Sequence, residues 1–166
     1  MTRGYISVGS NIDKEKNILT CLRALALFFG DLIVSSTYET EPVGFSGDTF
    51  YNLLVGFDSE LDVKTIAKQL RQIELDHGRT RDCKKFSART LDLDLILYGD
   101  LIISDGRLQI PRDEIERYAF VLEPLAEIAP NLKHPVSHLS YGEMWEKFNK
   151  SDLQQKRVKP GWRSTE

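Results

Sequence analysis

The order of its apolar patterns is the feature of this sequence that most constrains the fold. Two segments, 13–30 and 62–78, repeat apolar residues at three- and four-residue steps, which is typical of amphipathic helices. Short runs of β-branched and aromatic residues flank and separate these helices, at 4–8, 32–38, 50–57 and 91–98. The resulting order, β-α-β-β-α-β, is that of the ferredoxin-like, split βαβ arrangement. We therefore expect an α+β fold in which an antiparallel sheet carries its helices on one face.

Further patterns follow the fourth predicted strand as C-terminal additions. Residues 114–119, 122–128 and 141–149 are candidate short helices, and Pro130 ends the second of them. The polar and basic residues 151–166 show no periodicity, so we expect a flexible tail there. The 166 residues suit one domain, assigned to residues 1–150, because domains commonly hold about 100–200 residues.

Charge and cysteine content exclude several classes of protein. The chain has 22 Lys and Arg residues against 25 Asp and Glu residues, so it lacks the basic excess of a surface that coats nucleic acid. No apolar stretch approaches the ~18 residues that suggest a membrane span. The only cysteines are Cys21, in an apolar helical run, and Cys83, in a basic loop. These positions argue against a structural disulfide and fit a reducing compartment better. We expect a cytoplasmic monomer with neither nucleic-acid nor membrane partners.

A pair of aspartates in the fourth predicted strand is the first candidate for chemistry. Side chains alternate along a strand, so Asp92 and Asp94 should share one face while the leucines between and beside them share the other. Two carboxylates one pleat apart repel each other unless a cation lies between them or water screens them. Magnesium prefers such hard oxygen ligands. The pattern thus indicates either a metal site or a solvated outer face of the sheet.

The loop that precedes this strand favours the metal site. Residues 78–89 contain five basic side chains, immediately before the aspartates. Basic groups beside a carboxylate-bound metal are what a nucleoside triphosphate requires, although a solvated basic loop is common too. The sequence contains neither a P-loop nor a Gly-x-Gly-x-x-Gly motif. Any phosphate chemistry must therefore use a different cradle.

An ordered set of short motifs then identifies a family resemblance. The motifs are Gly9-Ser10-Asn11, residues 36–44, Phe50-Tyr51-Asn52, Ile73-Glu74, residues 78–81, residues 89–94 and residues 120–125. Together they resemble the 6-hydroxymethyl-7,8-dihydropterin pyrophosphokinases of folate biosynthesis, from residue 4 to about residue 133. The resemblance implies transfer of the β,γ-diphosphate of ATP to the hydroxymethyl group of the dihydropterin, with release of AMP. It also implies two Mg²⁺ ions as cofactors and ATP as co-substrate.

The same resemblance implies roles for individual residues. The positions that match metal ligands are Asp92 and Asp94, which with Arg79 and Arg89 form the expected catalytic set. The positions expected to bind ATP are Glu74, Arg81, Lys85 and Arg112. The positions expected to bind the pterin are Thr40, Pro42, Val43, Phe50, Asn52 and Phe120. In that reading the two phenylalanines stack on the flat pterin ring and the Asn52 amide reads its edge.

Two positions depart from the family pattern. Arg112 follows Pro111 where the family has a histidine, and Tyr118 stands where the family has an arginine, with Arg117 one place earlier. These departures leave a second interpretation open. In it the chain is a divergent paralogue that binds a pterin or nucleotide with altered or no catalysis. Binding of single-stranded RNA on a ferredoxin-like sheet is a third reading, but the strand signature of that class is missing.

Overall fold

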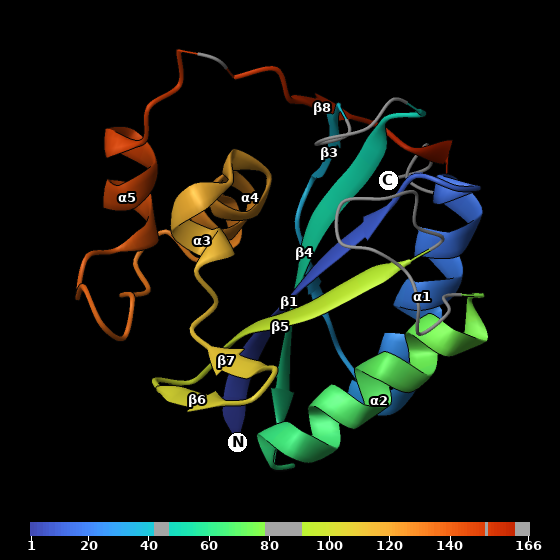
Figure 1. Cartoon of the computed structure of the whole chain (residues 1–166), viewed down its shortest axis with the longest axis horizontal. Helices are drawn as coiled ribbons and strands as arrows, with labels where there is room; N and C mark the ends of the chain where they lie inside the picture. Colours follow the sequence, from blue (N-terminus) through green and yellow to red (C-terminus); the bar gives the residue numbers. More distant parts are fainter. Residues whose placement is uncertain (42–46, 79–90, 152, 162–166) are drawn as a thin grey trace.

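A six-stranded antiparallel sheet forms the centre of the computed structural model, which describes residues 1–41, 47–78, 91–151 and 153–161 (Figure 1). The strands of this sheet are β1 (Thr2–Ser10), β2 (Ile33–Val34), β3 (Thr37–Thr40), β4 (Phe50–Ser59), β5 (Asp92–Tyr98) and β8 (Lys156–Val158). Their order is β5-β1-β4-β3-β8, and β2 pairs with β4 as well. The predicted α+β class with an antiparallel sheet is confirmed.

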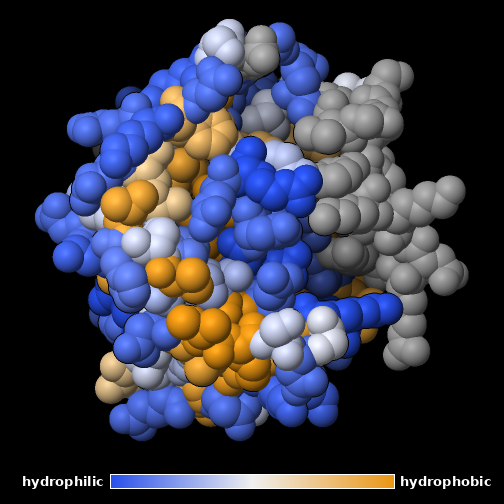
Figure 2. Space-filling view, turned by 60° about the vertical axis from the view of Figure 1, so that its left-hand side comes forward, coloured by the Kyte–Doolittle hydropathy of each residue, from blue (hydrophilic) through white to orange (hydrophobic). Residues whose placement is uncertain are grey.

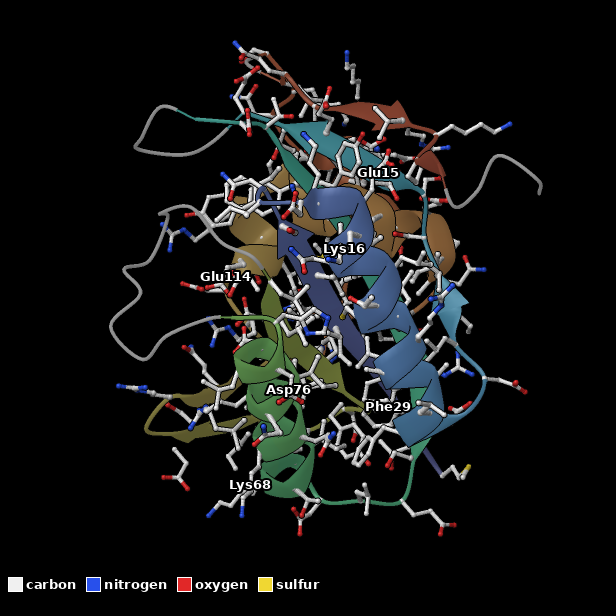
Figure 3. All side chains as sticks on the ribbon, turned by 90° about the vertical axis from the view of Figure 1, so that its right-hand side faces the viewer. Glu15, Lys16, Phe29, Lys68, Asp76 and Glu114 are labelled. Atoms are coloured by element: carbon white, nitrogen blue, oxygen red, sulfur yellow. The ribbon has the colours of Figure 1, made fainter. Side chains whose placement is uncertain are left out.

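Helices α1 (Lys14–Phe29) and α2 (Val63–Asp76) lie side by side on the first face of this sheet (Figures 1 and 3). Their apolar stripes and the inward side chains of β1, β4 and β5 form one buried core. The Asp62 side chain caps α2 by accepting a hydrogen bond from the Thr65 amide at 2.8 Å, as its position predicts. Gly30 ends α1 with a φ of 85°, a conformation that a side chain would strain.

Three further helices, α3 (Glu114–Arg117), α4 (Ala119–Ile128) and α5 (Tyr141–Lys147), cover the second face. They form a separate core with Tyr5, Leu54 and Leu97 of the sheet. The expectation of helices on one face only is therefore wrong for the whole chain, although it holds for α1 and α2. The physical reason is that the sheet alternates apolar residues on both faces, so both faces must be covered.

Strand β5 contains a bulge that decides which of its side chains reach which face. Tyr5 of β1 pairs with Leu97, whereas the next residue, Ile6, pairs with Leu95. Ile96 is therefore the extra residue, and it lies in the second core together with Leu97. After the bulge, Tyr98 returns to the first core, where its hydroxyl donates to the backbone oxygen of Ser59 at 3.1 Å.

The C-terminal segment takes part in the sheet. The sequence predicts a flexible tail for residues 151–166, whereas the structure places Lys156–Val158 in strand β8 beside β3. The remaining strands, β6 (Ile103–Asp105) and β7 (Leu108–Ile110), form a separate hairpin. No helix among the described residues is long and apolar enough to cross a membrane. Seen from the α5 side, the surface is mainly hydrophilic with hydrophobic patches (Figure 2).

Candidate active site

The two aspartates of β5 lie on the second face of the sheet, as their alternation predicts. Asp92 pairs with Gly9 of β1 and Asp94 pairs with Ser7, and both carboxylate side chains are half-buried. The alternate leucines are buried in the core of the first face, at positions 91, 93 and 95. The strand therefore separates its apolar side chains from its carboxylates completely over this stretch.

Burial and charge act together on Asp94. Desolvation, followed by the neighbouring carboxylate of Asp92, raises the pKa of Asp94 to about 7, although Arg112 opposes this rise. A divalent cation would remove the repulsion between the two carboxylates and stabilise both in their ionised form. Oxygen donors of this kind suit Mg²⁺. The described residues contain no cluster of three or more potential His, Cys, Asp or Glu ligands.

Glu74 holds the backbone between the two aspartates. It lies near the end of α2, is 8% exposed, and accepts a hydrogen bond from the Leu93 amide at 2.8 Å. A buried carboxylate that accepts a backbone N–H makes a strong, charge-assisted hydrogen bond. Glu74 is expected from the sequence to bind ATP. One oxygen of its carboxylate, Oε2, fixes the strand that carries both aspartates, and its assignment to ATP stays a prediction.

Arg112 approaches the aspartates from the segment before α3. Its guanidinium makes a two-point contact with Glu114, at 2.7 Å from Nε and 3.3 Å from Nη2, and its amide donates to the Ile96 oxygen at 3.1 Å. Burial disfavours the charged guanidinium, but the carboxylates of Glu114 and Asp94 outweigh this and raise the pKa of Arg112. Arg112 is therefore a fixed cation beside Asp94.

Sequence reasoning missed Glu114, which orients Arg112. The available signal was its spacing, since Glu114 follows Arg112 by two residues. Figure 3 shows Glu114 near the edge of the sheet, away from the exposed surface of α1. The other basic residue of this region, Arg117, forms an ion pair with Asp113 at 3.3 Å and lies over the Tyr118 ring at 5.4 Å.

A second group of predicted residues lies across β1 from the aspartates. Asn52 of β4 pairs with Gly9, so Asn52, Gly9 and Asp92 form one row across three strands. The Asn52 amide is buried and donates to the Thr40 hydroxyl at 2.8 Å. A Cβ atom on Gly9 would lie only 3.0 Å from Asn52 Oδ1, so any side chain at the centre of the row would crowd the Asn52 amide.

The two predicted stacking residues lie on the same side of the sheet. Phe50 precedes Asn52 by two residues on β4 and so faces the second side. Phe120, at the beginning of α4, packs against the core of that side. Its ring stacks on Tyr118 with centroids 5.0 Å apart and an angle of 20° between planes. The residue that departs from the family pattern thus supports the aromatic side chain beside it.

Six predicted site residues lie outside the described residues, and the structure places none of them. They are Pro42, Val43, Arg79, Arg81, Lys85 and Arg89. The described part of the site therefore consists of the aspartate pair with Glu74 and Arg112 on one side of β1, and Thr40, Phe50 and Asn52 on the other. Phe120 comes from the helical layer that covers the same face.

The chain is similar to several known proteins. A family model described as 7,8-dihydro-6-hydroxymethylpterin-pyrophosphokinase (HPPK) matches residues 5–130. The chain is 38% identical over 136 residues to the 2-amino-4-hydroxy-6-hydroxymethyldihydropteridine pyrophosphokinase of Methylorubrum extorquens, which covers 80% of this chain and 85% of that protein. It is 34% identical to the enzyme of the same name from Haemophilus influenzae, over 84% of this chain and 89% of that protein.

Longer proteins also contain a similar region. The chain is 35% identical to the folic acid synthesis protein FOL1 of Dictyostelium discoideum over 84% of its own length, but it spans only 22% of that protein. Among solved structures, HPPK-DHPS of Plasmodium falciparum matches with a TM-score of 0.70 at 15% identity, over 88% of this chain and 44% of that chain. This structural likeness shows a shared fold.

Proposed function

The chain belongs to the 7,8-dihydro-6-hydroxymethylpterin-pyrophosphokinase family, and from this premise we propose that it transfers the β,γ-diphosphate of ATP to 6-hydroxymethyl-7,8-dihydropterin. The pterin hydroxymethyl oxygen forms a bond to the β-phosphorus, the bond from that phosphorus to the α-phosphate oxygen breaks, and AMP leaves. The hydroxyl proton is lost in the same reaction. The product supplies folate biosynthesis.

The row formed by Asn52, Gly9 and Asp92 is the single observation that carries this proposal. It places a group suited to a heterocycle edge and a group suited to a cation on the same face of adjacent strands. A substrate bound along this row would contact both groups at once. Holding two reactants in line in this way is a large part of phosphoryl-transfer catalysis.

Asp92 and Asp94 would hold Mg²⁺ in this reaction. When bound, Mg²⁺ neutralises charge on the triphosphate oxygens. Glu74 keeps the strand between the two aspartates in place through the Leu93 amide, and Arg112 adds a permanent positive charge next to Asp94. We assign Arg112 to a phosphate of ATP, because its forked guanidinium can replace the histidine of the family pattern.

Phe50 and Phe120 would stack on the pterin ring, while Asn52 and Thr40 would bind its polar edge. The remaining expected roles stay proposals of the same kind. They assign the pterin loop to Pro42 and Val43, and assign the phosphates to Arg79, Arg81, Lys85 and Arg89. Glu74 is assigned to ATP in the same way, and its bond to the Leu93 amide gives it a positioning role as well.

We also infer a ferredoxin-like core from β1, α1, β3, β4, α2 and β5. The order of its four strands, β5-β1-β4-β3, with antiparallel neighbours throughout, supports this assignment. We further propose one domain over residues 1–150, to which β8 adds a strand at the edge of the sheet, and a cytoplasmic, monomeric enzyme. Size-exclusion chromatography with light scattering tests the monomer, and a mass of about twice 19.0 kDa would contradict it.

The deciding experiment measures AMP release from ATP with Mg²⁺ and 6-hydroxymethyl-7,8-dihydropterin. Asp92→Asn and Asp94→Asn should each lower kcat by about 100-fold or more with the fold retained, since charge neutralisation dominates this chemistry. Asp105→Asn is the matched control. Asp105 is exposed, and in the described part of the chain its one ion pair is with Lys64 of α2. No AMP from the unmodified protein, with retained pterin binding, would select a binding module instead.

A further inference from the structure

The segment that follows α5 contacts two elements of the proposed pterin site, β3 and α4, although it lies beyond the region that matches the family. It runs from α5 across the top of the molecule to β3 and the beginning of α1 (Figure 1). In this segment Val158, Arg157 and Lys156 pair with residues 37, 38 and 39 of β3. Without β8, strand β3 would form the edge of the sheet.

Strand β3 depends on this pairing because its other attachment is short. Only residues 38–40 pair with β4, and Thr40, the last of them, is the residue that binds Asn52. Short edge strands open easily, since few hydrogen bonds hold them. Strand β8 adds a second ladder of the same length on the other side of β3. The position of Thr40 thus depends on the C-terminal segment.

Gln155 connects the same segment to α4. Its side-chain amide donates to the Ala119 oxygen at 3.1 Å and to Glu123 Oε1 at 2.8 Å. Ala119 directly precedes Phe120, which is expected to stack on the pterin. One residue therefore links the first turn of α4 to the strand that begins at Lys156.

Buried and charged contacts reinforce these links. Arg157 Nε donates to the Tyr38 hydroxyl at 3.0 Å, and that hydroxyl donates to Glu127 of α4 at 3.0 Å. Tyr38, the middle member of this chain of bonds, is only 1% exposed. At the far end, the Gly161 amide donates to Glu15, which Figure 3 shows at the beginning of α1 near β8.

Glu39 connects the segment to Thr49, which follows the expected pterin-binding residues Pro42 and Val43 in the sequence. Its carboxylate lies 3.6 Å from Lys156 Nζ and 3.8 Å from Lys14 Nζ, and it accepts a hydrogen bond from the Thr49 hydroxyl at 3.0 Å. Thr49 directly precedes Phe50. The C-terminal segment consequently contacts Glu39 and Ala119, next to Thr40 and Phe120, and reaches Thr49, next to Phe50, through Glu39.

We propose that residues 155–161 form a strap that positions the pterin site by fixing β3 and the first turn of α4 relative to each other. This inference rests on the proposed function, since it concerns the same pterin pocket. Gln155 and Arg157 are positioning residues in this view, because they act through Ala119 and Tyr38. The aspartate pair lies across β1 from the strap, so the strap should affect the pterin and leave ATP nearly unaffected.

Steady-state kinetics of AMP release test the strap with Gln155→Ala and a chain ending at Gln154. We expect the pterin KM to rise about fivefold for Gln155→Ala and about tenfold or more for the shortened chain, with the ATP KM changed less than about twofold; a lost hydrogen bond has an effect of this size. Gln154→Ala is the matched control, because Gln154 is the exposed neighbour of the same type. It should behave like the unmodified protein.

Hydrogen exchange gives a second measurement that does not need turnover. The amides of residues 37–40 should exchange at least about tenfold faster in the shortened chain than in the full chain. Equal pterin KM values in Gln155→Ala and the unmodified protein, or unchanged exchange of β3, would overturn the strap. Absence of AMP from the unmodified protein refutes the proposed function, while the exchange measurement still reports on the strap. Should the shortened chain not fold, Gln155→Ala alone decides.

Discussion

Replacing Asp94 by asparagine should stabilise the metal-free protein at alkaline pH while abolishing its activity. The pKa of Asp94 is raised to about 7 by burial and by Asp92, whereas an aspartate in an unfolded chain has a pKa of about 3.9. This difference corresponds to about 4 kcal/mol. Because Asp94 is only half-buried, solvent screening reduces the expected effect to about 2–3 kcal/mol.

The sign follows from which state holds the proton. Below pH 4 Asp94 is mostly protonated in both states, so it changes the free energy of unfolding little. Between pH 4 and pH 7 the unfolded chain loses this proton while the folded protein keeps it, and stability falls as the pH rises. Above pH 7 the folded protein must hold a poorly solvated carboxylate, and the full destabilisation is present.

Urea unfolding followed by circular dichroism, in EDTA at pH 4 and at pH 8, measures the effect. Asp94→Asn should raise the free energy of unfolding by about 2–3 kcal/mol at pH 8 and by less than about 0.5 kcal/mol at pH 4. Asp105→Asn, at an exposed position, should change little at either pH. A variant less stable than the unmodified protein at pH 8 would refute the reasoning, because attraction to Arg112 would then exceed the cost of burial.

Other expected outcomes concern single contacts of the site and its supports. Glu74→Ala should lower the free energy of unfolding by about 1–3 kcal/mol, since it leaves the Leu93 amide without its carboxylate acceptor; an unchanged urea midpoint would contradict this. Phe120→Ala should raise the pterin KM about five- to tenfold in the AMP-release assay with little change in the ATP KM, and a parallel rise in both would remove its assignment to the pterin. Burial holds the pKa of His134 below its usual value, so the unfolded chain binds a proton at this residue before the folded protein does. In the Asp94→Asn variant, where Asp94 no longer titrates, the free energy of unfolding should therefore decline as the pH falls below about 6.5. Urea titrations between pH 5.5 and pH 7.5 check this, and a flat profile would disagree.

Local patterns predicted the elements that carry the site because they depend on periodicity alone. The alternation around Asp92 and Asp94 correctly predicts their shared face, and the apolar repeat over 62–78 correctly predicts α2. The contacts made by those residues were not predictable in the same way. Glu74 lies 19 positions before Leu93, and only the packing of α2 against β5 brings them together.

The sequence did not predict elements that main-chain hydrogen bonds hold in place. Strand β8 is basic and exposed, so it has no apolar alternation that would distinguish it from a tail; its hydrogen bonds to β3 come from the main chain. The Asn11 side chain, just before α1, does not cap that helix, and its amide donates to the Asp48 oxygen at 3.2 Å. That interaction requires β4 to lie beside β1, which no local pattern specifies.

The bulge at Ile96 reverses the alternation of side chains between the two faces of the sheet partway along β5. Before it, even-numbered positions face the C-terminal helices and present the carboxylates; after it, Tyr98 faces α1 and α2 and bonds to the chain just before α2. Deletion of Ile96 would leave a single, unbroken alternation of side chains along the whole strand. Either the aspartates would turn into the apolar core, or Tyr98 would lose its anchor. Length changes at this point are therefore far less tolerable than substitutions, whatever residue replaces the isoleucine.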